Sequence, residues 1–144
     1  MADQEKQIRR FRRVADQRLN TAEFLLKHGF DLDAVYLAGY TVECALKALV
    51  LRWTPRGGFH PMWVRLTQVG AKGHDFEYLK DLLKEQRSGR NKTDRETLGS
   101  LAIHLKRVAT WSTDLRYQVG SLKPKEARQF VQAVRVIRET CARS

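Results

Sequence analysis

The sequence lacks the short motifs by which many enzymes and metal proteins are recognised. Its 144 residues include only two cysteines, Cys44 and Cys141, and their spacing is not that of metal ligands. It has no glycine-rich phosphate loop, no nucleophile elbow and no zinc-binding spacing. Enzyme classes that depend on those motifs are excluded, and we expect neither a metal nor a cofactor. Cys44 lies in an apolar stretch, where a small buried thiol is expected in a reducing compartment.

The sequence also has little that would direct it out of the cell or into a membrane. Its first residues include Asp3 and Glu5 instead of an apolar signal region. The longest apolar run, residues 34–51, contains Glu43 and Lys47, so it is a poor membrane span and a good buried helix. These features predict a cytoplasmic protein that does not enter a membrane.

Positive charge is what the sequence has in excess. Its 27 basic residues face 16 acidic ones, which gives a net charge of +11. Such an excess favours anionic partners, above all nucleic acid, through long-range attraction and counterion release. A generally basic surface, or one covered by an acidic partner protein, explains the same excess. Three basic stretches, residues 6–13, 84–95 and 123–138, would form a nucleic-acid track if they lay on one surface.

No segment alternates with period two, and five segments show the three- and four-residue spacing of helices. They predict an all-α fold, a compact bundle of four or five helices in a single domain, residues 1–144. We expect Asp31 or Asp33 to cap the second helix, and a capping box at residues 93–96 to begin the fourth. The five predicted helices cover residues 8–26, 32–53, 75–87, 93–108 and 124–141.

One predicted connection is unusually long. Residues 54–74 join the second and third helices over about twenty residues, well beyond the usual length. Long connections often carry function. Four glycines lie in this one, and its large apolar residues indicate that it packs on something. It forms either a lid over a site or a cluster folded back on the domain, and we favour the second. The large apolar residues are Phe59, Met62, Trp63 and Leu66.

Glu43 and Lys47 are the only charges in the apolar run. Their spacing of four places them side by side on one helix face. An unpaired charge in such surroundings is costly, so we expect them to form a pair. The pair either fixes the register of the bundle or places Glu43 at a site, where it would orient a ligand or handle a proton. The residues favour the structural role.

A second polar group, residues 111–117, lies between two predicted helices. The guanidinium of Arg116 suits a phosphate, and Tyr117 suits stacking on a base or donating a hydrogen bond. Asp114 would orient Arg116 or cap a turn. Alternatively, Arg116 binds carbonyl groups at the end of the fourth helix and Tyr117 fills a seam.

None of the four histidines pairs with another histidine or a cysteine at metal spacing. His74 and Asp75 open the third predicted helix. There they would help to hold an anion at the helix N-terminus or to cap the helix, and capping is the commoner role.

Residues 33–49 resemble the second helix of HEPN domains (higher eukaryotes and prokaryotes nucleotide-binding), with small residues, a glutamate and then Ala-Leu-Lys-Ala-Leu. Residues 73–75 with Leu79 resemble the entry into the family's third helix, and residues 115–117 resemble its later segment. The resemblance covers most of the chain. It implies a bundle of four or five helices that commonly dimerises. It also implies cytoplasmic roles in toxin–antitoxin, anti-phage or other RNA-directed systems, often beside a small nucleotidyltransferase.

Many HEPN domains are metal-independent ribonucleases, whose motif is an arginine, four to six residues and then a histidine. Here Arg116 fits the arginine, but residues 121–123 are Ser-Leu-Lys, and no other Arg–His pair has the spacing. We therefore expect a non-catalytic homodimer, formed through the second helix, that binds RNA or a nucleotide. Its binding residues would be Arg116, Tyr117, Lys47 and Glu43.

Two alternatives to the binding role stay open. A divergent ribonuclease would use Arg116 and Asp114, with His74 or Glu43 as the group that moves protons. A protein-binding scaffold or antitoxin subunit would cover its basic surface with an acidic partner.

Overall fold

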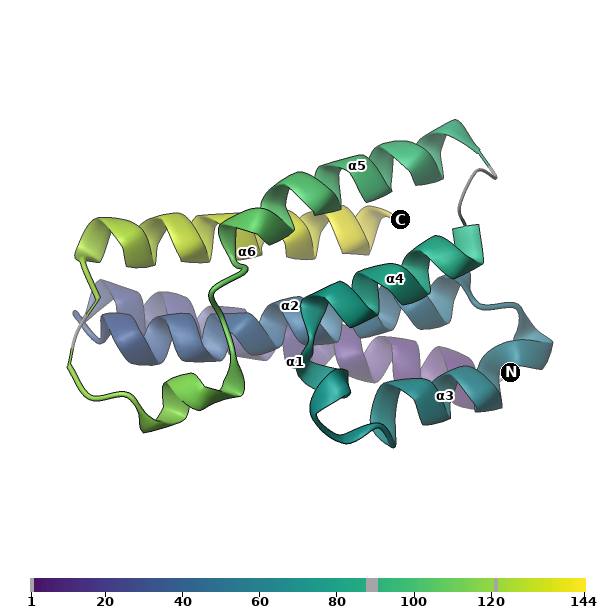
Figure 1. Ribbon diagram of the computed structural model, residues 1–144, viewed down its shortest axis with the longest axis horizontal. Helices are drawn as coiled ribbons and strands as arrows, with labels where there is room; N and C mark the ends of the chain where they lie inside the picture. Colours follow the sequence, from purple (N-terminus) through teal and green to yellow (C-terminus); the bar gives the residue numbers. More distant parts are fainter. Residues whose placement is uncertain (1, 88–90, 121) are drawn as a thin grey trace.

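Helices account for nearly all of the described chain. The computed structural model describes residues 2–87, 91–120 and 122–144, and within them it has helices and no strand. The all-α class is therefore confirmed. Figure 1 shows the six α-helices, α1 (Ala2–Lys27), α2 (Asp31–Trp53), α3 (Phe59–Thr67), α4 (Phe76–Arg87), α5 (Lys92–Arg107) and α6 (Pro124–Arg143). The short 3-10 helices are η1 (Arg56–Gly58), η2 (Gly70–His74) and η3 (Thr113–Tyr117).

Helix α2 is the centre of the bundle. It is apolar nearly all round, and such a helix is stable in water only when its neighbours cover it. Helices α1, α4 and α6 pack against it, and 16 of its 23 residues are buried. It is long and apolar enough to cross a membrane, yet 83% of its most apolar window is buried inside the protein. The predicted buried helix at residues 34–51 is thus confirmed.

Helices α1 and α6 cover α2 with single apolar stripes. On α1 the stripe includes Ile8, Leu19 and Ala22, which are at most 3% exposed. Gly29, with a φ of 85°, ends the turn that follows α1 and lets the chain reverse into α2. The buried stripe of α6 consists of Ala127, Phe130, Val131, Ala133, Val134, Ile137 and Cys141.

Residues 54–74 form more structure than the sequence predicted. They contain the nine-residue helix α3, flanked by η1 and η2, so the bundle has one α-helix more than expected. Met62 and Leu66 are 3% and 1% exposed. The Tyr78 hydroxyl of α4 donates to the Arg65 carbonyl at 2.8 Å. The segment therefore folds back on its own domain, which confirms the preferred expectation over a lid.

Both predicted helix caps were wrong. Phe30, not Asp31 or Asp33, is the N-cap of α2, and it makes no side-chain hydrogen bond there. Helix α5 begins at Lys92 after Asn91, whose Oδ1 accepts from the Asp94 backbone N–H at 2.7 Å. Asn91 Nδ2 in turn donates to Asp94 Oδ2 at 2.8 Å. Asn91 thus caps α5 two residues before the predicted capping box, and Asp94 holds its side chain in place.

Candidate functional site

The buried ion pair of α2 is the first part of the candidate site. Lys47 Nζ lies 2.9 Å from Glu43 Oε2, and each side chain is only 8% exposed. The ammonium of Lys47 also lies 5.9 Å from the centre of the Phe11 ring of α1, within range of a cation–π contact. The expected pair is confirmed. Lys47 is enclosed between α1 and α2, so its role at the site is to hold Glu43 in place.

His74 is the second partner of the same carboxylate. Its Nδ1 lies 2.7 Å from Glu43 Oε1, although 31 residues separate the two in sequence. A carboxylate oxygen only accepts, so Nδ1 is the donor and Nε2 is left for other contacts. The His74 side chain is 43% exposed, whereas that of Glu43 is 8% exposed. Glu43 therefore orients an imidazole that reaches the surface.

A close approach of η2 to the backbone of α3 accompanies the contact of His74 with α2. Gly73 lies in η2, and a Cβ added there would be 3.1 Å from the Leu66 carbonyl oxygen and 3.6 Å from Lys47 Nζ. A larger residue would push η2 away from the Leu66 backbone, and His74 with it. The imidazole also meets the ring of Tyr40 edge-on, with centroids 6.3 Å apart. No sequence pattern predicted that His74 would contact Glu43.

Trp111 fixes the opposite wall of the site. A Cβ added at Gly39 of α2 would lie 1.9 Å from a ring atom of Trp111, so the indole sits directly on this glycine. The indole N–H donates to the Tyr36 carbonyl at 3.0 Å. Its ring stacks on Phe76 at 5.1 Å and 7° and meets Tyr40 edge-on. This cluster joins α2, the start of α4 and the segment after α5.

The two walls enclose a pocket of about 300 Å³. Polar groups from two distant segments meet there, His74 and Asp75 on one side and Ser112 and Thr113 on the other. Asp75 Oδ1 accepts from the Glu77 backbone N–H at 2.9 Å. Asp75 therefore caps α4, the commoner of its two predicted roles, and His74 offers the pocket its ionisable ring.

Residues 111–117 continue from this pocket into η3. Ser112 is the N-cap of η3 and accepts from the Asp114 backbone N–H at 3.2 Å, so it is Ser112 that caps this turn. Tyr117 is 73% exposed and does not fill a seam. The backbone of Arg116 belongs to η3. Its side chain lies outside the described part of the structure, so the expected contacts of Arg116 with Asp114 or with helix carbonyls are not placed.

The first and third basic stretches meet at one end of α6. Arg12, in the first, lies beside Arg138 of the third and Cys141 near the end of α6. Arg128, also in the third, lies at the opposite end of α6, beside Leu26. The second stretch includes residues 88–90, which lie outside the described residues. The expectation that all three stretches share one surface stays a prediction.

The two cysteines offer no nucleophile at neutral pH. Burial raises the pKa of Cys44 to about 12, and the neighbouring Glu43 carboxylate adds to the rise. Burial likewise raises the pKa of Cys141 to about 12. A thiol with such a pKa stays protonated and unreactive. In the described residues no three side chains of histidine, cysteine, aspartate or glutamate gather to form a metal site.

A family comparison accounts for this combination of helices. Residues 8–144 match the model of the HEPN domain. The chain belongs to the HEPN domain family. Neither a curated protein nor a solved structure matches the chain. The match begins within α1 and runs to the end of α6, so it includes every residue of the pocket described above.

This HEPN domain departs from the ribonuclease motif that the resemblance implies. Position 116 holds the arginine, but positions 121–123 hold no histidine. His74 lies in the pocket whose other wall is formed by residues 111–113, three residues before Arg116. The fold therefore brings an imidazole towards the segment that carries the arginine, from a different part of the HEPN domain.

Proposed function

We propose that this HEPN domain binds RNA or a nucleotide at the His74 pocket and the adjoining η3. The observation that carries the proposal is the exposure of Tyr117 on the short helix that leads out of the pocket. Thr113 lines the pocket, and Tyr117 follows it by about 8 Å along a 3-10 helix. An exposed aromatic ring at this distance suits a base, and the arginine of the same short helix, Arg116, suits the adjoining phosphate.

The charge of the chain supports the same proposal. A net charge of +11 attracts polyanions and releases their counterions on binding. Arg116, whose backbone belongs to η3, precedes Tyr117 in sequence and is of the residue type that suits a phosphate. Lys47 and Glu43 take part indirectly, because they hold His74 in the pocket wall. No catalytic step is needed for this role.

The proposal includes the cellular setting that accompanies the family. The domain acts in the cytoplasm as a homodimer, beside a nucleotidyltransferase partner, in a toxin–antitoxin or defence system. Most of α2 is buried within one chain, so a second copy would meet only its N-terminal half, where Tyr36, Leu37 and Tyr40 are partly exposed. Sedimentation equilibrium tests the dimer, and a purely monomeric protein would remove that part of the proposal.

Two substitutions in the α5–α6 connection test the binding site. Fluorescence anisotropy with a labelled single-stranded RNA at low ionic strength measures the affinity. Tyr117→Ala removes the stacking ring and should weaken binding about tenfold or more. Val119→Ala is the matched control, since Val119 is fully exposed in the same connection and offers no polar or aromatic contact. The proposal fails if no RNA or DNA is retained at low ionic strength, or if both variants bind like wild type.

A second candidate function, a divergent ribonuclease, is favoured by one contact. The His74–Glu43 pair is arranged as in enzymes where a buried carboxylate orients a histidine for proton transfer. Nε2 would accept the proton of an RNA 2′-hydroxyl, with Arg116 beside the phosphate. Asp114 is exposed on η3 and would help to orient Arg116.

Histidine variants separate this candidate from simple binding. Wild type is incubated with bulk RNA beside Arg116→Ala, His74→Ala and His60→Ala. His60 is an exposed histidine on α3 and serves as the control. A ribonuclease of this kind degrades RNA as wild type and His60→Ala, and loses activity in the other two variants. Equal decay in all samples means that a contaminant cuts the RNA, and the candidate is abandoned.

A further inference from the structure

A second, larger hollow lies at the end of the bundle where α1 meets α2. Its volume is about 980 Å³. Thr110 and Leu122, at the two ends of the α5–α6 connection, line it, whereas Trp111 to Thr113 line the His74 pocket. The connection therefore separates the two sites. In Figure 1 the same connection, in yellow-green, loops around this end of the bundle.

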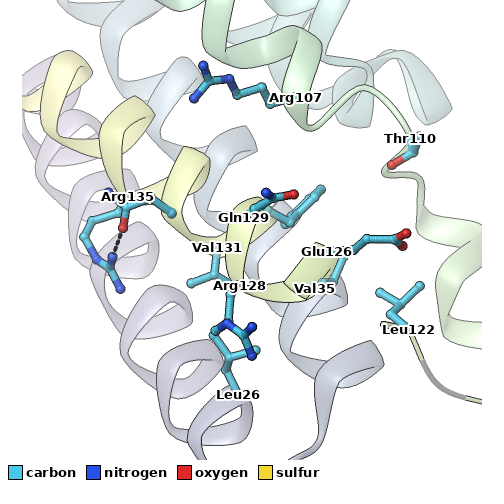
Figure 2. A pocket seen from close by; sticks show the side chains of 12 residues that line it. Leu26, Val35, Arg107, Thr110, Leu122, Glu126, Arg128, Gln129, Val131 and Arg135 are labelled. Carbon is cyan, nitrogen blue, oxygen red and sulfur yellow. Dashed lines mark hydrogen bonds between the residues drawn. The ribbon is translucent and has the colours of Figure 1, made fainter. Parts of the chain in front are cut away.

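The wall of this groove combines apolar side chains with arginines. The partly exposed Leu26 of α1 and Leu122 contribute apolar surface, above the buried side chains of Val35 and Phe130. Phe30, in the turn between Leu26 and Val35, is 55% exposed. Figure 2 shows that the arginines come from two helices, Arg107 from α5 and Arg128 and Arg135 from α6.

Two of these arginines have no internal counter-charge. Arg135 lies 3.4 Å from Glu23 of α1 and is compensated. The ion pairs of the described residues include neither Arg107 nor Arg128, and both side chains are exposed. Glu126 also lines the groove but lies in no ion pair with them. The groove therefore presents uncompensated positive charge beside an apolar surface.

The combination of positive charge and apolar surface favours one kind of occupant over the others. A second copy docked symmetrically on this groove would bring its own Arg107 and Arg128 towards these arginines, so a homodimer contact at this face is disfavoured. An RNA backbone would gain from the arginines but would leave the partly exposed Leu26 and Leu122 in contact with phosphate or water. An amphipathic segment with apolar anchors on one face and carboxylates beside them satisfies both features.

We propose that the groove is a docking site for an acidic amphipathic segment of another protein, with its carboxylates paired to Arg107 and Arg128. The segment's apolar side chains lie on Leu26, Leu122 and the neighbouring Phe30. This role goes beyond RNA binding, because it uses a separate face of the domain. An RNA in the His74 pocket and a protein in the groove can be held at the same time, on the two sides of the α5–α6 connection.

The probe is a fluorescently labelled helical peptide with leucines along one face and glutamates on the others. A second peptide carries lysine in place of each glutamate, and a third carries serine in place of each leucine. The proteins are wild type, Arg107→Glu/Arg128→Glu, and the control Arg95→Glu/Arg143→Glu. The control changes the charge equally, also once on α5 and once on α6, at exposed positions away from the groove.

The groove pair, Arg107→Glu/Arg128→Glu, should bind the acidic peptide about tenfold or more weakly than wild type does. The control pair, Arg95→Glu/Arg143→Glu, should bind this peptide with an affinity within about twofold of that of wild type. The lysine and serine peptides should not bind wild type. Equal weakening in both pairs, or equal binding of the lysine peptide, overturns the proposal. So does loss of RNA affinity in the groove pair with peptide affinity unchanged, because the groove would then be a nucleic-acid site. Failure of Tyr117→Ala to affect RNA leaves these outcomes unchanged, since they are read on peptide.

Discussion

Glu43 shows at the scale of a single residue how structure and function are joined in this protein. One of its oxygens binds Lys47 and the other binds His74. A buried ion pair alone is weak evidence for stability, because desolvation offsets most of its attraction. The third partner, His74, links the buried pair to the surface, since the Glu43 carboxylate holds this half-exposed imidazole in a fixed orientation. The structural and functional interpretations of Glu43 are therefore compatible.

Replacing Lys47 by methionine should destabilise the protein by about 3 kcal/mol, at the low end for a broken buried pair, because His74 still binds Glu43. The double variant Glu43→Leu/Lys47→Met removes both charges and should recover most of this free energy of unfolding. Urea denaturation measures both. An unchanged midpoint for Lys47→Met would show that the pair is solvated and plays no part in the core.

Gly39 gives a second prediction at this scale. Gly39→Ala places a methyl group where the Trp111 indole lies, 1.9 Å from a ring atom. The clash outweighs the gain in helix propensity and should cost about 1–2 kcal/mol of unfolding free energy. Gly99→Ala on α5, where nothing lies within 4 Å of the added Cβ, should be neutral or stabilising. Equal stability of the two variants would contradict the packing of Trp111 on α2.

At the scale of elements, α3 is held by an ion pair that responds to pH. Arg65 donates two hydrogen bonds to Glu85, at 2.8 and 3.0 Å, and these lower the pKa of Glu85 from its ordinary 4.5. A lowered folded-state pKa means that the stabilisation is present above the unfolded pKa and is lost as pH falls through the folded one. Both side chains are exposed, so the contribution is about 0.5 kcal/mol.

Amide hydrogen exchange of α3 tests this link. Glu85→Gln should speed exchange at pH 6 and differ less from wild type at pH 3, because protonation of the Glu85 carboxylate weakens the pair in wild type as pH falls. Glu77→Gln is the control, because Glu77 pairs with Lys80 within α4 and does not reach α3. A Glu85→Gln effect of the same size at both pH values would show that the charge is not what holds α3.

The elements that the sequence predicted are those with long, uninterrupted periodicity. The apolar run of α2 and the apolar stripes of α1 and α6 were sufficient to predict these three helices. Helix α3 was missed, although Phe59, Met62, Trp63 and Leu66 have the spacing i, i+3, i+4, i+7 of a helical face. Its nine residues are few, it is flanked by glycines, and Pro61 lies in its first turn, where proline is tolerated. The spacing of these four residues predicts a helix, whereas the flanking glycines are typical of a loop.

In the candidate site, only contacts between residues close together in sequence could be predicted. The spacing of four between Glu43 and Lys47 predicted their contact, because it follows from helix geometry alone. The contact of Glu43 with His74 depends on how η2 returns to α2 past Gly73, and no sequence pattern states that path. The same holds for Trp111, whose position on Gly39 joins segments 72 residues apart.

At the scale of the whole molecule, the amino-acid composition determines the net charge but does not predict where the charges lie on the surface. Part of the third basic stretch is neutralised, since Arg135 lies near Glu23 and Arg138 lies 2.8 Å from Asp16. Arg107 belongs to none of the three stretches, yet it shares a groove with Arg128. Two candidate faces result, a pocket with an exposed aromatic ring nearby, which we propose for nucleic acid, and an arginine-lined groove, which we propose for an acidic protein. The α5–α6 connection lies between them.

The salt dependence of RNA affinity is the most direct test of the central claim, that this domain binds RNA through phosphate. The affinity of the intact protein for labelled single-stranded RNA is measured by anisotropy over a series of salt concentrations. The account predicts that the logarithm of the association constant falls linearly with the logarithm of salt concentration. The predicted slope is about −2 or steeper, which corresponds to roughly three neutralised phosphates. A flat line, or no binding at the lowest salt, would contradict it.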